Sequence, residues 1–371
     1  MKQNSSSIKF LSWWSILVPC LSCTIVFYIN WVSKENLNTA NMAIVTLFLF
    51  TSVFAAVHHA EVIAQKTGEP YGTFILAVAV TIIEVALIIS LMLSGKENTE
   101  ELARDTVFAT IMIVLNCIIG LCLLLGAAKH HEQAFGVFGV NAALSSLTTL
   151  SVFTLILPNF TTSKHGPAYS SSQLIFVGFF SLILYLTFVM IQTIRHRNYF
   201  LPKEISNVEH NEKPELQQPT LLQTVNSCVL LTISLFSIVL LAKALSQPTE
   251  NLILSFGLPK SLVAIIIAGV VLLPEGVSAI KAAKRNHLQT SLNLALGSAL
   301  ATIGLTIPVV SFFSVYYQMP LTLGLDNKSI VLLILSLLIS ILSFGTGRTT
   351  VLQGAIHLLI FAVYLLLSMI P

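Results

Sequence analysis

Two acidic residues lie deep inside long apolar stretches of this 371-residue chain. Glu84 is the buried acid of Gly68–Leu93, and Glu275 is the one acid of Gly257–Leu305. Each stretch opens with Gly-x-Pro, and each acid follows its proline by a similar distance, 14 residues in the first case and 16 in the second. A carboxylate in the middle of a bilayer costs roughly 3 kcal/mol or more, so both are candidate functional residues.

A buried carboxylate can lose its charge by binding a proton or have it balanced by a metal cation. A site that accepts either partner and is costly to leave empty meets the physical requirement for ion exchange. The simpler alternative is that each acid pairs with a buried Lys or Arg. No Lys or Arg lies at comparable depth inside any apolar stretch, so the pattern favours the functional interpretation.

Two carboxylates are too few for a dehydrated cation, because hard cations such as Ca²⁺ take about six to eight oxygen ligands. Polar residues near the two acids, or in the stretches that follow them, can supply more. For the hydroxyls, interhelical packing and hydrogen bonding is an equally good interpretation. The candidate metal ligands are Glu84, Glu275, Thr81, Asn116, Ser298 and Thr302, and the candidate proton-binding residues are Glu84 and Glu275.

A histidine pair stands near the end of another apolar stretch, in the sequence HHAEVIAQK. Its titratable residues are His58, His59 and Glu61. Histidine titrates near neutral pH, which makes this segment a candidate proton relay. The alternative is a helix end at the membrane surface, and the spacing differs from the HExxH motif of zinc peptidases.

The composition is that of a polytopic membrane protein. Hydrophobic residues make up 55%, charged residues only 9%, and the mean hydropathy is +0.86. Soluble globular proteins have about 25% charged residues, so that class is excluded. The net charge of +3 is spread over short loops, so it reports orientation in the membrane and gives no sign of a nucleic-acid partner. The expected surroundings are membrane lipid. The chain has no Gly-rich phosphate loop, and neither ATP-driven pumping nor a bound cofactor is expected.

A bilayer crossing needs about 20 apolar residues in a helix. The sequence predicts an all-α integral membrane protein with about eleven such spans. Their approximate limits are 10–32, 40–64, 72–94, 107–128, 136–158, 172–194, 221–245, 259–282, 289–316, 328–346 and 349–370.

When the first span is set aside, the only long polar connection divides the other ten spans into two sets of five. We therefore predict an N-terminal span (1–35), a first five-helix repeat with Glu84 (36–194), a cytoplasmic linker (195–220) and a second five-helix repeat with Glu275 (221–371). An odd number of spans per repeat makes the two copies inverted, as in many secondary transporters. Twelve Lys and Arg on the side of the N-terminus, against seven opposite, place the N-terminus in the cytoplasm and the C-terminus outside.

The loop KENTEELARD, residues 96–105, carries four acids on the predicted outer side. It is interpreted either as a solvated loop or as a weak collector of cations at the outer mouth.

Two long segments carry a family resemblance: HHAEVIAQKTGEPYGTFILAVAVTIIEVALIISLML and LLPEGVSAIKAAKRNHLQTSLNLALGSALATIGLTIP. They resemble the bacterial ChaA-type calcium/proton and sodium/potassium/proton antiporters, in the cation exchanger branch of the calcium/cation antiporter superfamily. The resemblance implies an eleven-span antiporter of the bacterial inner membrane whose two acids bind cation and proton alternately. The family's Gly-Asn-x-x-Glu motif is altered at both places, which read VTIIE and VLLPE and lack its Gly and Asn.

The sequence thus predicts a transporter, not an enzyme, that exchanges cytoplasmic Ca²⁺, Na⁺ or K⁺ for external protons by alternating access. A monovalent-only Na⁺(K⁺)/H⁺ antiporter is one alternative, because the altered motifs remove oxygen ligands. A passive cation channel is another, although no ring of carbonyls or charges is found. An intramembrane enzyme built on the histidine pair would need a further ligand or nucleophile motif. The physiological cation and a homo-oligomeric state are left open.

Overall fold

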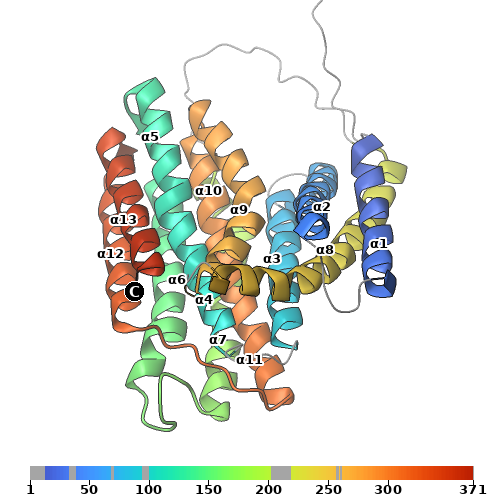
Figure 1. Cartoon of the computed structure of the whole chain (residues 1–371). Helices are drawn as coiled ribbons and strands as arrows, with labels where there is room; N and C mark the ends of the chain where they lie inside the picture. The colour runs from blue at the N-terminus through green and yellow to red at the C-terminus, as the bar shows by residue number, and fades with distance from the viewer. Residues whose placement is uncertain are drawn as a thin grey trace, which may run out of the picture. The chain divides into compact units, whose positions relative to one another are not determined.

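The protein is almost entirely helical (Figure 1). The computed structural model describes residues 13–32, 39–67, 71–93, 100–201, 219–255, 259 and 261–370. Long apolar stretches become helices because a helix pairs its own backbone N–H and C=O groups, which a bilayer cannot do. The described strands are two short ones, β1 (Gln133–Ala134) and β2 (Arg348–Thr349), which pair antiparallel.

The helical elements follow one another along the chain, with the longest interval between η5 and α8. Four of the short η elements, η1, η2, η4 and η6, are π-helical turns that continue a neighbouring α-helix, whereas η3 and η5 are 3₁₀ turns. Their bounds are α1 Trp13–Val32, α2 Thr39–Thr67, α3 Tyr71–Met92, α4 Leu102–Met112, η1 Ile113–Ile118, α5 Ile119–His130, α6 Val137–Ser151, η2 Val152–Ile156, η3 Leu157–Phe160, α7 Ser171–Met190, η4 Ile191–Arg195, η5 Arg197–Tyr199, α8 Leu221–Ser255, α9 Ser261–Lys284, α10 Leu288–Ala301, η6 Thr302–Thr306, α11 Ile307–Tyr316, α12 Asn327–Phe344 and α13 Val351–Met369.

Each predicted span coincides with one helix or with one continuous run of helical elements. In the described residues, eight helices are long and apolar enough to cross a membrane, and a ninth candidate is the bent pair Leu262–Leu273 and Glu275–Lys284. Two shorter apolar helices, Trp13–Ile25 and Val78–Ser90, lie within the remaining predicted spans. The prediction of an all-helical membrane protein is confirmed, and the count of eleven crossings stays a prediction.

The chain forms two compact units, each made from both sides of the predicted linker. The first contains Met1–Ala79 and Glu209–Pro248, and the second contains Val80–Val208 and Thr249–Pro371. The predicted domain limits instead follow the order of the chain, and they stay a prediction.

In the first unit, α1 is held against α2 by buried polar contacts. Ser22 and Ser52 share a hydrogen bond of 2.6 Å between their Oγ atoms, and His59 Nε2 lies 2.9 Å from the carbonyl oxygen of Ser15. Pro19 stands four residues after Ser15 and has no N–H to donate to that carbonyl. His59 therefore supplies the hydrogen bond that the proline removes from α1.

In the second unit, α9 packs against α4, α5 and α10, and α13 packs along α5. The contact between α13 and α5 is very close at Gly354. A Cβ atom on this residue would come within 2.5 Å of the backbone nitrogen of Leu124 and within 2.9 Å of the carbonyl oxygen of Gly120. Only glycine permits this approach of the two backbones.

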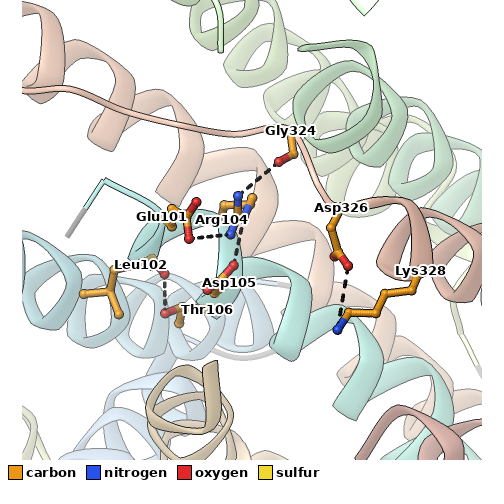
Figure 2. Close-up of polar contacts among 8 residues, drawn as sticks. All are labelled: Glu101, Leu102, Arg104, Asp105, Thr106, Gly324, Asp326 and Lys328. Atoms are coloured by element: carbon orange, nitrogen blue, oxygen red, sulfur yellow. Dashed lines mark hydrogen bonds and ion pairs between the residues drawn. The ribbon is translucent and has the colours of Figure 1, made fainter. Parts of the chain in front are cut away.

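The start of α4 is fixed by ionic and backbone contacts (Figure 2). Arg104 binds Asp105 at 2.8 Å and Glu101 at 3.1 Å, and it donates to the carbonyl oxygen of Gly324 at 3.2 Å. The backbone N–H of Thr322 donates to the carbonyl oxygen of Glu100 at 3.0 Å. The segment after α11 is thereby tied to α4, and two acids of the predicted outer loop serve as partners of an arginine. Residues 96–99 of that loop lie outside the described part.

Replacing Gly354 with Ala should destabilise the packing of α13 on α5, because the added methyl group meets backbone atoms that cannot move aside. Overpacking of this kind costs about 1–3 kcal/mol. The apparent unfolding temperature of the detergent-solubilised protein should fall. The control is Gly269→Ala on α9, where a new Cβ atom meets no atom within 4 Å. Equal unfolding temperatures for the two variants would contradict the close contact.

Candidate functional site

Glu84, on α3, is buried and accepts hydrogen bonds from two threonines of different helices. Only 3% of the surface of this residue is exposed. Thr110 of α4 donates to Oε1 at 3.2 Å, and Thr302 of η6 donates to Oε2 at 2.6 Å. Both carboxylate oxygens of Glu84 therefore accept hydrogen bonds from hydroxyl groups. These bonds lower the cost of burying the carboxylate, and lipid has no donors to form them.

Glu275, on α9, is buried in the same way, with 7% of its surface exposed. Ser298 of α10 donates a hydrogen bond to its Oε2 atom. In the described residues, neither glutamate forms an ion pair, since the pairs there involve Arg104, Lys328 and Arg348 near helix ends. The interpretation of the two acids as partners of buried cations therefore finds no support among the described residues.

The two carboxylates converge on one helical turn. Ser298 binds Glu275 and Thr302 binds Glu84, and these two hydroxyls stand four residues apart along α10 and η6. Four residues of helix rise about 6 Å, so both acids contact neighbouring positions of a single helix face. The carboxylates are also close enough to interact electrostatically. Two charges that repel each other in a dry site favour a proton or a cation between them.

The helix that carries Glu275 is bent at the site. The axes of Leu262–Leu273 and Glu275–Lys284 differ by 54°, and Pro274 lies at the break. Proline has no backbone N–H and so removes one intrahelical hydrogen bond, and a sharp bend in a helix is usually found at such a residue. At Gly276 a Cβ atom would come within 3.2 Å of the Ile118 side chain of η1, so α9 lies very close to that π-helical turn.

The groups around the acids are hard oxygen donors. In the described part of the chain, no group of three or more His, Cys, Asp or Glu side chains gathers to hold a metal ion. What the structure brings together is four carboxylate oxygens and the hydroxyl oxygens of Thr110, Ser298 and Thr302. Oxygen donors of this kind suit Ca²⁺ and the alkali cations better than soft transition metals.

The other predicted ligands lie in different surroundings. Thr81 is buried one turn before Glu84, and its role as a ligand stays a prediction. Asn116 is fully buried in η1, but its amide binds elsewhere: Nδ2 donates to Ser336 Oγ at 2.9 Å, and Oδ1 lies 3.3 Å from His357 Nδ1. These contacts direct Asn116 towards α12 and α13, and its predicted role as a ligand receives no support from them.

The predicted histidine segment lies in α2, in the first unit. His59 is fully buried and bound to the backbone of α1, whereas His58 and Glu61 are partly exposed. The ring of His58 lies 5.4 Å from that of Trp14. The residues of the predicted relay are thus neighbours on one helix, and the relay itself stays a prediction.

Thr110 was not among the residues predicted from the sequence. A signal was present, because Thr110 follows Glu84 by 26 residues and Ser298 follows Glu275 by 23. In each half, the hydroxyl that binds the glutamate is carried by the span that follows. A search of the span after each acid for hydroxyl side chains would have included it.

Comparison with known proteins identifies the family of the chain. The profile of a family described as "Sodium/calcium exchanger protein" matches residues 37–194 and 226–370. The chain belongs to this exchanger family. It is 47% identical to a putative ionic transporter, y4hA, of Sinorhizobium fredii, over 96% of both chains. It is 34% identical to the sodium-potassium/proton antiporter ChaA of Escherichia coli, over 95% of both chains.

The exchanger family also accounts for the fold. The crystal structure of an H⁺/Ca²⁺ exchanger, CAX, superimposes with a TM-score of 0.70 at 15% sequence identity, covering 95% of this chain and 88% of that one. The resemblance noted in the sequence is therefore confirmed at the level of the family. The two matched segments leave out the first predicted span and the linker.

Replacing Thr302 with Val should disturb the carboxyl group of Glu84, because Thr302 donates a hydrogen bond to Glu84 Oε2, and such a bond shifts the stretching frequency of a carboxyl group. We expect the infrared C=O stretch of protonated Glu84, assigned by its loss in Glu84→Gln, to change frequency in Thr302→Val. The control is Thr187→Val on α7, whose hydroxyl binds the Ile183 carbonyl oxygen of its own helix. An unchanged band in Thr302→Val would show that the two side chains are not in contact.

Proposed function

We propose that this protein is a secondary active antiporter of the inner membrane that exports a cytoplasmic cation in exchange for external protons. The observation that supports this most strongly is the convergence of Glu84 and Glu275 on the hydroxyls of Ser298 and Thr302, one turn apart. The relatives named above include a sodium-potassium/proton antiporter, and a structural neighbour is an H⁺/Ca²⁺ exchanger.

The chemistry of the site fits alternate occupation by proton and cation. The hydroxyls of Thr110 and Thr302 donate to the carboxylate oxygens of Glu84. A hydroxyl can rotate and present its lone pairs instead, so the same oxygens can turn from donor to metal ligand. Protons arriving from outside neutralise the acids and release the cation. After the protein changes from the outward-open to the inward-open conformation, the protons leave to the cytoplasm and another cation binds.

The cation is proposed as Ca²⁺, Na⁺ or K⁺. One Ca²⁺ against two protons balances the charge of two carboxylates. Two carboxylates with three hydroxyls provide about as many oxygens as Ca²⁺ takes, provided that most of them bind at once. The altered Gly-Asn-x-x-Glu motifs lack an amide ligand in each half, and this favours the alternative of a monovalent-only Na⁺(K⁺)/H⁺ antiporter. A passive channel is the remaining, weaker alternative.

The proposal includes the predicted architecture of one span followed by two inverted five-helix repeats, with the N-terminus and linker in the cytoplasm. The family profile supports it, because it matches one segment on each side of the linker. The π-helical turns support it as well. η1 lies in the span after the one with Glu84, and η6 lies in the span after the one with Glu275. Inverted repeats of this kind place their ion site near the middle of the bilayer.

Glu84→Gln and Glu275→Gln should each abolish proton-coupled transport in proteoliposomes. We expect initial rates to fall by more than about 100-fold, the upper end of what loss of a supporting partner costs a metal site. Addition of Ca²⁺, Na⁺ or K⁺ in turn to vesicles with an imposed pH gradient shows which cation dissipates it. The control is Glu132→Gln, an exposed acid paired with Arg348.

If both glutamate variants dissipate the gradient like the parent protein, the assignment of the site is wrong. Cation flux that is independent of the proton gradient would instead indicate a channel.

We also propose His58, His59 and Glu61 as a proton relay. The His59→Gln variant retains an N–H donor for the Ser15 carbonyl but cannot titrate near neutral pH. Under the relay proposal, its initial rate of proton-coupled transport should fall while α1 remains docked, as measured by an unchanged unfolding temperature. A rate equal to that of the parent protein would contradict the relay and show that His59 serves only to dock α1.

A further inference from the structure

A second buried polar cluster lies beside the span that carries Thr110. It consists of Asn116 of η1, Ser336 of α12 and His357 of α13, all fully buried. Asn116 Nδ2 donates to Ser336 Oγ at 2.9 Å, and Ser336 Oγ donates to the Leu332 carbonyl oxygen at 2.7 Å. Three side chains from three helices therefore meet in a place where each polar atom without a partner would cost free energy.

The hydrogen-bond pattern determines how His357 acts. Asn116 Oδ1 can only accept, so His357 Nδ1, which lies 3.3 Å away, carries the hydrogen and donates it. The other ring nitrogen of His357, Nε2, is buried and finds no hydrogen-bond partner among the described residues. His357 is thus a neutral donor directed at the π-helical turn.

A π-helical turn needs outside support because it replaces α-helical bonds with poorer ones and contains an extra residue. In η1, the backbone N–H of Ile119 donates to Val114, five residues earlier, instead of four. Return to α-helical pairing would rotate one side of the span against the other by about 100°. His357 and Ser336 bind the side chain in the middle of this turn, so they favour the π-helical form over the α-helical one.

Both ends of this span are fixed, so a change in the turn must appear in between. At the start, Arg104 is bonded to Gly324 in the segment after α11 (Figure 2). The carbonyl oxygen of Glu100 accepts a hydrogen bond from Thr322 of the same segment. At the far end, two side chains donate hydrogen bonds to the last residues of α9. Lys129 donates to the carbonyl oxygen of Lys284 at 3.1 Å, and Gln133 donates to the carbonyl oxygen of Ala283 at 2.9 Å. Thr110 lies between these anchors, three residues before the π-helical turn. Its position against Glu84 depends on the register that the turn sets.

The second π-helical turn near the acids is also held from outside. Tyr185 of α7 packs directly on Gly304 of η6, where a Cβ atom would come within 2.6 Å of the tyrosine Cβ. Thr302, the partner of Glu84, begins this turn. Both turns that adjoin the glutamates' hydroxyl partners are therefore supported by a neighbouring helix, α13 for η1 and α7 for η6.

We propose that His357 is a positioning residue for ion exchange, which holds η1 in its π-helical form through Asn116 and thereby keeps Thr110 in place against Glu84. This inference rests on the proposed function of Glu84 and Glu275. It assigns Asn116 to the support of the turn, and it gives α13 a part in ion affinity although this helix supplies none of the hydroxyls bound to the acids.

The test compares His357→Leu with His357→Asn in proteoliposomes, using the cation that the parent protein transports. Leu removes the donor, and Asn carries an amide N–H near the place of Nδ1. We expect His357→Leu to raise the half-saturating cation concentration about 10-fold or more, as for loss of an outer partner of a metal ligand. His357→Asn should restore most of the affinity and leave the pH profile of transport unchanged.

A double-mutant cycle tests the connection to the site. If His357 acts through Thr110, the losses caused by His357→Leu and Thr110→Val should be strongly non-additive, whereas independent sites give additive losses. Should His357→Leu not fold, Ser336→Ala serves in its place, because it removes the acceptor of Asn116 with little change in volume.

Several results would overturn the proposal: additive losses, parent-like affinity in both the leucine and the Ser336→Ala variants, or a pH profile flattened by His357→Asn, which would make His357 a proton carrier. These results differ from failure of the proposed function, in which the glutamate variants themselves keep transport.

Discussion

The structure depends on the need to satisfy two carboxylates inside a bundle of apolar helices. A bilayer offers neither water nor counter-charge, and an unpaired carboxylate there costs several kcal/mol. The chain meets this cost with hydroxyl groups: Glu84 binds Thr110 and Thr302, and Glu275 binds Ser298. Hydroxyls stabilise the acids without cancelling their charge, so the acids still attract protons and cations. Lysine or arginine partners would have stabilised the acids more strongly and left no charge for a cation.

The helices around this site are irregular in ways that match its demands. α9 bends by 54° at Pro274, and the spans after the two acids contain the π-helical turns η1 and η6. Each irregularity weakens regular backbone pairing and shifts the helix face that reaches the site. Close packing restricts these irregular places, with Gly276 against Ile118 and Gly304 against Tyr185. Rigid support of this kind fits a site whose few oxygen atoms must lie at defined positions.

A similar constraint acts in the first unit, where the group to be satisfied is a backbone carbonyl. Pro19 deprives the Ser15 carbonyl of its partner within α1, and His59 of α2 replaces it. A proline in a membrane helix is tolerated when a neighbouring helix satisfies the freed group. The polar contacts between α1 and α2 therefore determine where this first helix docks, while the apolar residues provide the contact area. His59 thus has a packing role in addition to the relay role proposed for it.

The sequence by itself determined the class of protein, the helical stretches and the presence of two acids, Glu84 and Glu275, inside apolar helices. These follow from local properties: helix formation depends on runs of apolar residues, and a lone acid in such a run is costly wherever the helix lies. Ser298 and Thr302 were likewise recognisable from their spacing. Only the tertiary structure decided that Thr302 binds Glu84, 218 residues away, while Ser298 binds Glu275. Only the tertiary structure directed Asn116 to His357, 241 residues away, and formed the π-helical turns. Such contacts depend on how side chains of distant helices pack together, and neither periodicity nor composition contains that information.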